Sequence, residues 1–290
     1  MSELHLDPSK RHEFVLLFDV KDGNPNGDPD AGNMPRVDPE TMQGLVTDVA
    51  LKRKVRDYVT LVKQNAPGYK IFIQSESALN ALIEEEAEAL SAEKNNKRAN
   101  KDLQKKMLEQ YYDIRMFGAV LSTGDYNAGQ VRGPVQLTFA RSFDPVLPLE
   151  LTITRQARTT DERMESGQTE MGKKPLVPYG LYRAHGFFNP FLAEAAGISP
   201  DDLGLFWDAL VNMFDFDRSA ARGEMSVRGL IVFTHENPKG NAPAHKLFGL
   251  VKVAKKAGVE SPRSYEDYEM ELTEPPRSVS MTLLVDPREG

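Results

Sequence analysis

The stretch that decides the fold runs from Phe14 to Arg36 and reads FVLLFDVKDGNPNGDPDAGNMPR. Its first part is short, apolar and bounded by polar residues, which predicts a β-strand from Phe14 to Val20. Its second part, residues 22–36, is dense in Gly, Pro, Asn and Asp, each of which favours turns by its own backbone mechanism. We name this segment the NPNG loop. A long, turn-rich loop between a strand and a helix is usually functional or disordered rather than a plain connection.

A basic helix is predicted after the loop, from Leu45 to Lys63, with Thr47 or Asp48 as its N-cap. Apolar residues recur along it at helical spacing and define one buried stripe: Leu51, Val55, Tyr58, Val59 and Val62. Successive residues are about 100° apart, so the basic side chains fall on the flanks of this stripe. One flank holds Lys52, Arg56 and Lys63, Arg53 sits further round, and Lys54 lies on the other flank.

The rest of the chain suggests a core with insertions. Residues 77–110 are highly charged and contain no Pro or Gly, which predicts one or two exposed, inserted helices. Residues 158–178 show neither helical nor strand periodicity between two strand-like segments, which indicates an arm that projects from a hairpin. Other predicted strands are 69–74, 131–143, 149–156, 179–188, 225–234 and 278–285, and other predicted helices are 200–214 and one near 246–257. This order favours an α+β fold with a ferredoxin-like or RRM-like core.

Composition limits the class of protein. The chain has 290 residues, of which 40% are hydrophobic, so it can bury a sizeable core. It has no cysteine, which excludes disulfides, thiolate zinc sites and a cysteine nucleophile. The N-terminus is polar, and no apolar stretch approaches the roughly 20 residues that cross a bilayer. We therefore expect a cytoplasmic protein that does not contact membranes.

The net charge of -7 argues weakly against nucleic acid as a partner. Binding, however, responds to local patches rather than to the average charge. The sign of the charge is segregated along this chain, because residues 84–93 are acidic whereas residues 52–56 are basic. The average is therefore a poor guide to the partner.

The acidic residues of the NPNG loop first suggest a calcium site. Asp22, Asn24, Asn26 and Asp28 match the first half of an EF-hand loop. The twelfth position is Asn33 instead of a bidentate Glu, and two prolines constrain the backbone. We therefore expect no calcium site here, and the plainer interpretation is a rigid turn that positions its neighbours.

A magnesium-dependent nuclease is the sharper alternative. Asp19, Asp22, Asp28 and Asp30 could supply the oxygen ligands that magnesium prefers. No general base with a distinctive spacing accompanies them. The chain also lacks a Walker loop, a dinucleotide fingerprint and a Gly-x-Ser-x-Gly elbow, so no cofactor and no familiar active site are expected. His185 lies in a strand-like segment, where a packed or hydrogen-bonded histidine is commoner than a catalyst.

Nucleic-acid binding has more support from the basic residues. Lys52, Arg53 and Arg56 can follow a phosphate chain along the predicted helix. Arg132 precedes Gly133, where a backbone can approach closely. The alternative is that these are ordinary solvated charges whose stems cover apolar surface. We favour binding for the helix and the arm, because charge there accompanies unusual loop chemistry.

Three segments together resemble a known family. They read NPNGDPDAGNMPRVDPETMQGLVTDVALKRKVRDY from Asn24, DIRMFGAV followed by QVRGPVQLTFARS, and RGLIVFTHENPKGNAPAHKLF. They are similar to blocks of the type I-C CRISPR backbone subunit, a member of the Cas-seven family in its Csd-two/Csh-two branch. The resemblance spans most of the chain. One departure is Met42, where Gly is expected before Gln43-Gly44.

The resemblance implies a single RRM-like domain over residues 1–290, with a helical insertion at about 77–110 and a thumb hairpin at about 155–178. It implies a non-catalytic protein whose copies wrap one CRISPR RNA in a head-to-tail filament within a Cascade complex. Other implied partners are target DNA, through the RNA–DNA hybrid, and the large, small and Cas-five-type subunits. Sequence-independent binding of this kind needs cations on phosphates and apolar wedges between bases.

Motifs and resemblance together predict one set of RNA contacts. It consists of Asn24, Asn26, Arg36, Lys52, Arg53, Lys54, Arg56, Gln130, Arg132, Arg155, Arg158, Met164, Met171, Lys173 and Lys174. Met164, Met171 or Leu176 would be the wedge. No catalytic residue, metal or cofactor belongs to this prediction. Two alternatives stay open: a metal-dependent ribonuclease that uses the Asp-rich loop, and an assembly protein that binds no nucleic acid.

Overall fold

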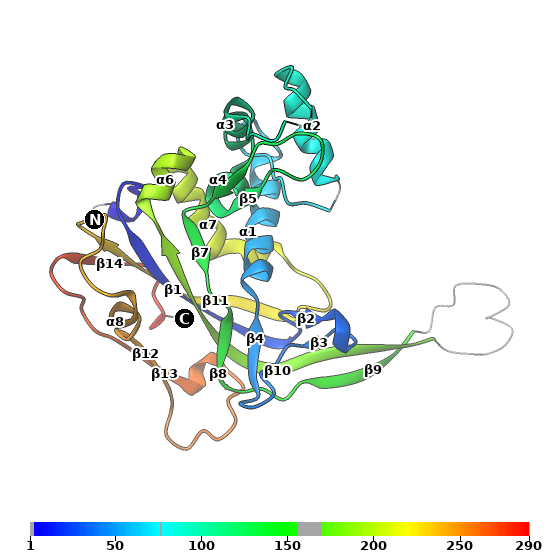
Figure 1. Ribbon diagram of the computed structural model, residues 1–290. Coiled ribbons are helices and arrows are strands. Elements are labelled where there is room, and N and C mark those ends of the chain that lie inside the picture. Colours follow the sequence, from blue (N-terminus) through cyan, green and yellow to red (C-terminus); the bar gives the residue numbers. More distant parts are fainter. Residues whose placement is uncertain (1–2, 76, 95, 156–169, 290) are drawn as a thin grey trace, which may run out of the picture.

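The computed structural model describes residues 3–75, 77–94, 96–155 and 170–289, and one large antiparallel sheet dominates it (Figure 1). The strand order is β14-β11-β1-β10-β8-β4, and β7 and β9 also pair with β10. The sheet strands are β1 (His12–Gly23), β4 (Gln43–Val46), β7 (Val135–Leu137), β8 (Ala140–Pro145), β9 (Leu149–Arg155), β10 (Glu170–Phe188), β11 (Glu224–His235) and β14 (Val279–Val285). The described part of the chain is therefore a mixed α/β structure built on an antiparallel sheet.

Shorter elements surround this sheet. The small paired strands are β2 (Gly27–Asp28) with β3 (Met34–Pro35), β5 (Gly118–Val120) with β6 (Gln130–Arg132), and β12 (Val251–Lys255) with β13 (Tyr268–Leu272). The helices are α1 (Asp48–Lys63), α2 (Leu79–Ala89), α3 (Lys101–Gln110), α4 (Tyr112–Phe117), α6 (Pro190–Ala196), α7 (Pro200–Phe216) and α8 (Ala244–Phe248), with 3-10 turns η1 (Leu4–Leu6), η2 (Pro29–Ala31) and η3 (Tyr265–Asp267). Among the described helices, none has the length and apolar character needed to cross a membrane.

Strand β1 lies in the middle of the sheet and is buried on both faces. Phe14, Leu16 and Phe18 point toward α1 and α7, whereas Val15 and Leu17 point toward α8 and the β12–β13 pair. Successive side chains of a strand alternate between faces, so two covered faces require a continuous apolar run. The apolar run at the start of the chain thus reflects the central place of this strand.

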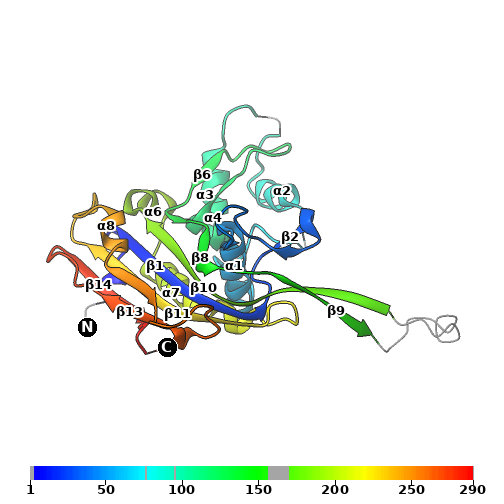
Figure 2. The same ribbon diagram turned by 90° about the horizontal axis from the view of Figure 1, so that it is seen from below.

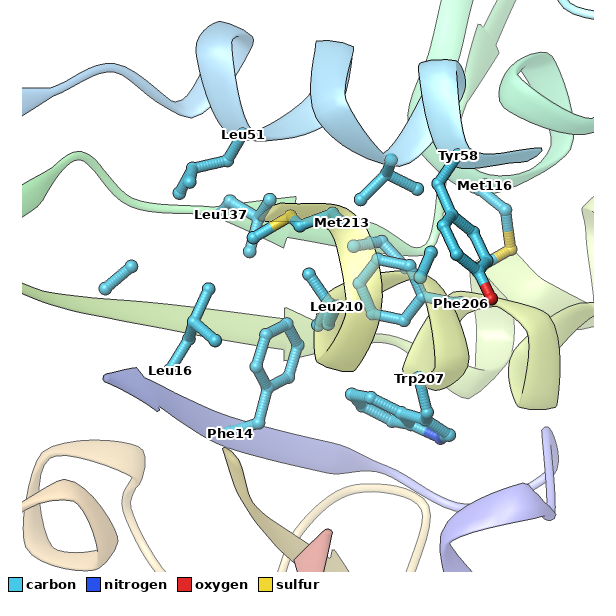
Figure 3. Packing of buried hydrophobic residues seen from close by; sticks show 14 of the residues in the cluster. Phe14, Leu16, Leu51, Tyr58, Met116, Leu137, Phe206, Trp207, Leu210 and Met213 are labelled. Carbon is cyan, nitrogen blue, oxygen red and sulfur yellow. The ribbon is translucent and has the colours of Figure 1, made fainter. Parts of the chain in front are cut away.

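Helices α1 and α7 cover one face of the sheet. Figure 3 shows Leu51 of α1 and Met213 of α7 gathered with Leu16 of β1 in one buried layer. Phe14 packs edge-to-face against Trp207, with ring centroids 5.1 Å apart. Burial of each such side chain stabilises the fold by about 1.5–3 kcal/mol, so this layer fixes α1 firmly against the sheet.

The charged insertion forms two helices, α2 and α3, with a core of their own. Ile83 of α2 and Leu103 and Met107 of α3 pack with Tyr111 and Tyr126. Figure 1 shows these helices at the top of the molecule, away from the large sheet. They bury one narrow face each, which explains why the segment is so highly charged elsewhere.

Helix α1 begins three residues later than the sequence indicated. Residues 43–46 form β4, which pairs with β8, and Thr47 then caps the helix by accepting a hydrogen bond from the Ala50 backbone N–H. Val62, expected in the buried stripe, is 44% exposed. The stripe therefore ends at Val59, one turn earlier than predicted.

Three other predicted elements differ in the structure, and the first is the strand predicted over 131–143, which is divided among β6, β7 and β8. Residues 69–74 form no strand beyond an isolated bridge from Lys70 to Tyr111, because the Asp113 carboxylate accepts the backbone N–H groups of Phe72 and Ile73. The helix predicted near 246–257 ends at Phe248, and β12 follows it. An alternating apolar pattern in β12 packs against the sheet, which favours a strand there.

Residues 170–178 of the predicted arm belong to a long hairpin. Strand β10 runs without a break from the core to Glu170, and β9 pairs with it from Leu149 to Arg155. Figure 2 shows this hairpin extending well beyond the sheet. The aperiodic stretch is thus strand from Glu170 onward, and the rest of it lies outside the described residues.

Candidate nucleic-acid interface

The NPNG loop begins at the root of the hairpin. Gly23, the last residue of β1, pairs with Val177 of β10, immediately beside the point where β9 joins β10 at Leu176. Strand β3 of the loop also contacts β10. Figures 1 and 2 both show β2 close to the hairpin root. The structure therefore brings together the two segments that the sequence marked as unusual.

Asn26 connects this loop to the start of α1. Its Oδ1 accepts hydrogen bonds from the Thr47 backbone N–H at 3.0 Å and from the Thr47 hydroxyl at 2.9 Å. The same hydroxyl oxygen caps the helix. Because one amide oxygen positions the N-cap residue, the loop and the helix hold a fixed relative orientation. Asn26 thus has a positioning role inside the protein.

Asn24 and Arg36 also hold the loop together. The Asn24 side-chain amide donates to the Asn33 carbonyl at 2.6 Å, and its backbone N–H donates to the Ala221 carbonyl at 2.8 Å. Arg36 pairs with Asp28 at 3.3 Å. Asn24 Oδ1 and Arg36 Nε are buried without a hydrogen-bond partner among the described residues. The loop is ordered by its own polar groups, as the rigid-turn interpretation predicts.

Lys54 is buried, and this corrects its expected place on a flank of the helix. Its side chain is 1% exposed and forms an ion pair with Asp217, which also pairs with Arg222. Burial lowers the pKa of Lys54 to about 8, and Asp217 counteracts part of this effect. With so little exposure, Lys54 can act only by fixing the chain between α7 and β11 against α1.

The other cations of residues 52–56 are also paired with carboxylates. Arg56 is 12% exposed and binds the Asp113 carboxylate at 2.8 Å, and Lys52 is 12% exposed and binds Asp48 at 3.1 Å. Both cations also lie over the ring of Phe117, at 5.2 Å and 5.7 Å. Arg53 is 46% exposed and pairs with Asp57 and Asp217. Within this basic run, Arg53 presents the most surface to solvent.

Arg132 and Gln130 lie on the β5–β6 pair, and both are exposed. Arg132 pairs with Gly118, the residue that follows Phe117, so it lies near the ring that Lys52 and Arg56 cover. Gly133 does permit a close backbone approach, but the neighbour is the Phe117–Gly118 backbone of the same chain. Gly133 therefore allows the backbone of residues 117–118 to pack closely against β6.

The hairpin carries the remaining predicted residues. Lys173 is 69% exposed and pairs with Glu150 on the neighbouring strand at 2.8 Å, and Lys174 is half-buried. Arg155 and Met171 belong to the described strands, whereas Arg158 and Met164 lie outside the described residues. Leu176, one of the three proposed wedges, is 5% exposed and belongs to the core. It cannot separate bases from that position.

The carboxylates of the nuclease alternative do not converge. Asp19 in β1 binds Arg228 at 2.9 Å and accepts from the Tyr179 hydroxyl at 3.2 Å, and burial raises its pKa. Asp28 binds Arg36 and accepts from the Asp30 backbone N–H. Within the described ranges, no three His, Asp or Glu side chains come close enough to hold a metal ion. The described residues therefore offer no metal site for the metal-dependent nuclease.

His185 is packed, as the sequence indicated. Its ring stacks on Phe248 with centroids 4.0 Å apart, and Arg183 donates to its Nε2 at 2.8 Å. Burial and the Arg183 charge lower the pKa of His185 to about 4. The imidazole is neutral at physiological pH and joins α8 to the sheet.

The sequence reasoning missed an aliphatic stripe on the hairpin. Leu149, Leu151 and Ile153 of β9 are 39%, 47% and 53% exposed. Their strict alternation with polar residues was visible in the sequence and predicted the strand. It did not show which face would stay uncovered, because that depends on the length of β10.

The long antiparallel sheet, the ordered loop and the projecting hairpin define a scaffold whose candidate contacts lie along an extended surface. Residues 10–273 match the family described as CRISPR-associated protein Cas7. Because the match covers most of the chain, the chain belongs to that family.

Relatives and solved structures are similar to this chain. CRISPR-associated protein Cas7 of Haloferax volcanii is 26% identical to this chain, and the alignment covers 91% of this chain and 81% of the relative. A chain of a "CRISPR RNA-guided surveillance complex, pre-nicking" has a TM-score of 0.49 and 13% identity, covering 77% of this chain and 78% of its own. A chain of a "CRISPR RNA-guided surveillance complex" has a TM-score of 0.47 and 14% identity, covering 77% and 68%.

Proposed function

We propose that this chain is a non-catalytic, CRISPR RNA-binding backbone subunit of a type I-C Cascade complex. Its copies bind one guide RNA head to tail and support target DNA recognition through the RNA–DNA hybrid. The large, small and Cas-five-type subunits are its other partners. The core is RRM-like and forms one domain over residues 1–290, with a helical insertion at about 77–110 and a thumb at about 155–178.

One observation carries this proposal beyond family membership. The NPNG loop and the projecting hairpin meet at one end of the sheet, where Gly23 pairs with Val177. A strand of nucleic acid laid over this end would meet backbone turns, exposed cations and an extended β-ribbon together. Such a surface recognises the shape and charge of a polynucleotide rather than its sequence. The three sequence segments that resemble the type I-C backbone subunit support the subtype.

Exposure divides the candidate contacts into two groups. Lys173 and Arg132 are exposed and can reach a phosphate without leaving the protein surface. Lys173 would leave only the exposed Glu150, whereas Lys52 and Arg56 are each 12% exposed and would have to leave a less exposed carboxylate. We therefore propose direct contact for the first group and for Arg53, and a positioning role for the α1 residues that are buried.

The salt dependence of RNA affinity tests this function. For single strands, the logarithm of affinity falls with the logarithm of salt by a slope of about -0.7 per phosphate contact. Lys173→Ala should make the slope less steep by about 0.7. Lys252→Ala is the matched control, because Lys252 forms a similar exposed cross-strand pair with Glu271 at 2.9 Å on the remote β12–β13 ribbon. It should leave the slope unchanged.

Two results would contradict the proposal. The first is a purified complex whose absorbance ratio shows no co-purified RNA, together with no binding of added guide RNA. The second is cleavage of labelled RNA in magnesium or manganese that Asp28→Ala abolishes, which would favour the metal-dependent ribonuclease instead.

A further inference from the structure

The turn that connects α7 to β11, which we name the 217–223 turn, lies against the start of the NPNG loop. An added Cβ at Gly23 would overlap the Arg222 carbonyl, so the two backbones are in direct contact. The Asn24 backbone N–H donates to the Ala221 carbonyl at 2.8 Å. Figures 1 and 2 show this turn in yellow near the end of β1. The first residues of the loop therefore rest on the backbone of the turn.

Polar groups, rather than apolar packing, hold the 217–223 turn in place. Residues 218–221 are all exposed. The anchor is Asp217, whose side chain is 11% exposed and whose carboxylate binds both Lys54 of α1 and Arg222 of the turn itself. Arg222 also donates to the Asp217 carbonyl at 3.2 Å. Because an exposed segment has few apolar contacts to order it, the position of the turn depends on the pair between Lys54 and Asp217.

Lys54 is itself enclosed by the protein. Its side chain is 1% exposed, and its ammonium lies 5.3 Å from the centroid of the Phe214 ring of α7. A side chain with so little exposure cannot reach a phosphate, and it cannot follow the turn to a different position. Lys54 is therefore a fixed point on α1 to which the turn is attached.

The NPNG loop is attached to the same helix at a second point. Asn26 binds both the backbone N–H and the hydroxyl of Thr47. Thr47 and Lys54 are about two helical turns apart, roughly 10 Å along the axis. Between these points the contacts run from Asn26 back to Asn24, and then through the 217–223 turn to Lys54. Helix, loop and turn thus form a closed chain of contacts.

We propose that Lys54 is a positioning residue for RNA binding, which acts through Asp217 and the 217–223 turn to hold the NPNG loop in its orientation at the hairpin root. This inference rests on the proposed function, in which loop and hairpin contact one RNA strand. Without the pair, the turn and the first residues of the loop can shift while Asn26 stays bound to Thr47. A loop that samples several orientations binds RNA more weakly, because binding must then order it.

The variant Lys54→Met tests this role, because methionine is also long and unbranched but carries no charge. We expect its affinity for a labelled single-stranded RNA to be about tenfold lower than that of the wild type. The slope of affinity against salt should keep its wild-type value, because Lys54 contacts no phosphate. Loss of a direct contact would instead make the slope less steep by about 0.7. Fluorescence anisotropy at a series of salt concentrations measures both quantities.

Two further variants complete this experiment. Asp217→Asn breaks the same link from its other end, so the double variant Lys54→Met/Asp217→Asn should bind RNA about as weakly as Asp217→Asn alone. Ile231→Val is the matched control for stability, because Ile231 is buried in the core on the opposite face of the sheet. This substitution lowers stability without touching the loop, the turn or α1, and it should leave RNA affinity unchanged.

The pH profile of RNA affinity provides a readout that a loss of stability would not give. Burial lowers the pKa of Lys54 to about 8. The charged groups that act on this lysine come from the helix and from the turn, and they are Arg53, Asp57, Asp217 and Arg222. The wild type should lose RNA affinity as pH rises through 8, since a neutral Lys54 attracts Asp217 less. The ratio of wild-type to Lys54→Met affinity should fall from about tenfold at pH 7 to about twofold at pH 9.

The outcomes separate this inference from the proposed function. Wild-type affinity in Lys54→Met, or a wild-type affinity that is constant between pH 7 and pH 9, would overturn the positioning role alone. A salt slope that is less steep in Lys54→Met would assign this residue to a phosphate contact and would also overturn it. Equal losses of affinity in Lys54→Met and Ile231→Val would do the same, because affinity would then follow overall stability. A wild-type chain that binds no RNA would remove the proposed function itself.

Discussion

The cations of α1 and those of the hairpin look alike in the sequence and differ in the structure. Lys54 and Arg56 are 1% and 12% exposed and are paired with Asp217 and Asp113. Lys173 is 69% exposed, and its partner Glu150 lies on the surface beside it. The first pairs stabilise the fold, because removing one partner would leave a buried charge. The second can exchange its partner for a phosphate at little cost.

The largest expected effect concerns the buried pair. Arg56→Ala leaves Asp113 buried without its cation, and we expect the free energy of unfolding to fall by about 3 kcal/mol. The backbone N–H groups of Phe72 and Ile73 still bind that carboxylate, so the loss should lie at the lower end for buried pairs. Denaturant unfolding measures it. Arg53→Ala, at a 46% exposed position on the same helix, is the control and should cost less than about 1 kcal/mol. Equal losses of unfolding free energy in the two variants would contradict the proposed difference between buried and exposed cations.

The pH dependence of stability sharpens the comparison at Lys54. Burial lowers the pKa of this lysine to about 8 in the folded protein, below its unfolded value of 10.5. Between these values the unfolded chain binds more protons than the folded one, so this group makes stability rise as pH increases from 8 toward 10. Compared with Lys54→Met, the wild type should gain about 2 kcal/mol over that range. Urea unfolding at a series of pH values measures the difference, and parallel curves for both proteins would contradict a buried lysine.

The turn before β4 contains Met42, and a substitution there tests whether its backbone conformation lowers the stability of the protein. Met42 has φ of 58°, in the left-handed region, where a side chain costs roughly 1–2 kcal/mol. This is the position at which the family resemblance predicts glycine. Met42→Gly should therefore stabilise the protein by about 1 kcal/mol in thermal or denaturant unfolding. Gly44→Ala is the opposite control, because its Cβ would meet the Tyr182 hydroxyl. If Met42→Gly does not increase the free energy of unfolding, then the turn adjusts its backbone so that Met42 is not strained.

The smallest effect on stability is expected at the hairpin. Lys173→Ala should change the free energy of unfolding by less than about 0.5 kcal/mol, because exposed ion pairs contribute little. The same variant should change the salt slope of RNA affinity, so stability and binding should respond separately. Denaturant unfolding provides the measurement. A loss comparable to that of Arg56→Ala would mean that the hairpin supports the core.

The sequence allowed the main elements to be predicted where burial is simple. Strand β1 was predicted because both of its faces are covered, and the Thr47 cap because a hydroxyl before an apolar helical pattern is a local signal. Leu45 and Val46 were predicted as the start of a helix but belong to β4, because this strand pairs with β8, about 100 residues later in the chain. Tertiary pairing of this kind leaves no local pattern.

The candidate site was predictable only in its composition. The sequence identified the NPNG loop and the basic residues, and the structure brings the loop to the hairpin root. It could not show that Arg56 would bind a carboxylate 57 residues away, or Lys54 one 163 residues away. Whether a cation is free or paired depends on such distant contacts. Exposure therefore had to come from the structure.

The unbroken length of β10 has a consequence for how the hairpin can vary. One strand runs from Phe188 in the core to Glu170, the outermost described residue of β10, so the pleat of the core decides which residues of the hairpin face each way. Removal of one residue from the outer part of β10 would turn every side chain beyond it to the other side. Insertions and deletions should therefore be tolerated there in even numbers, shared by both strands, and hairpins of different reach should keep the same two faces.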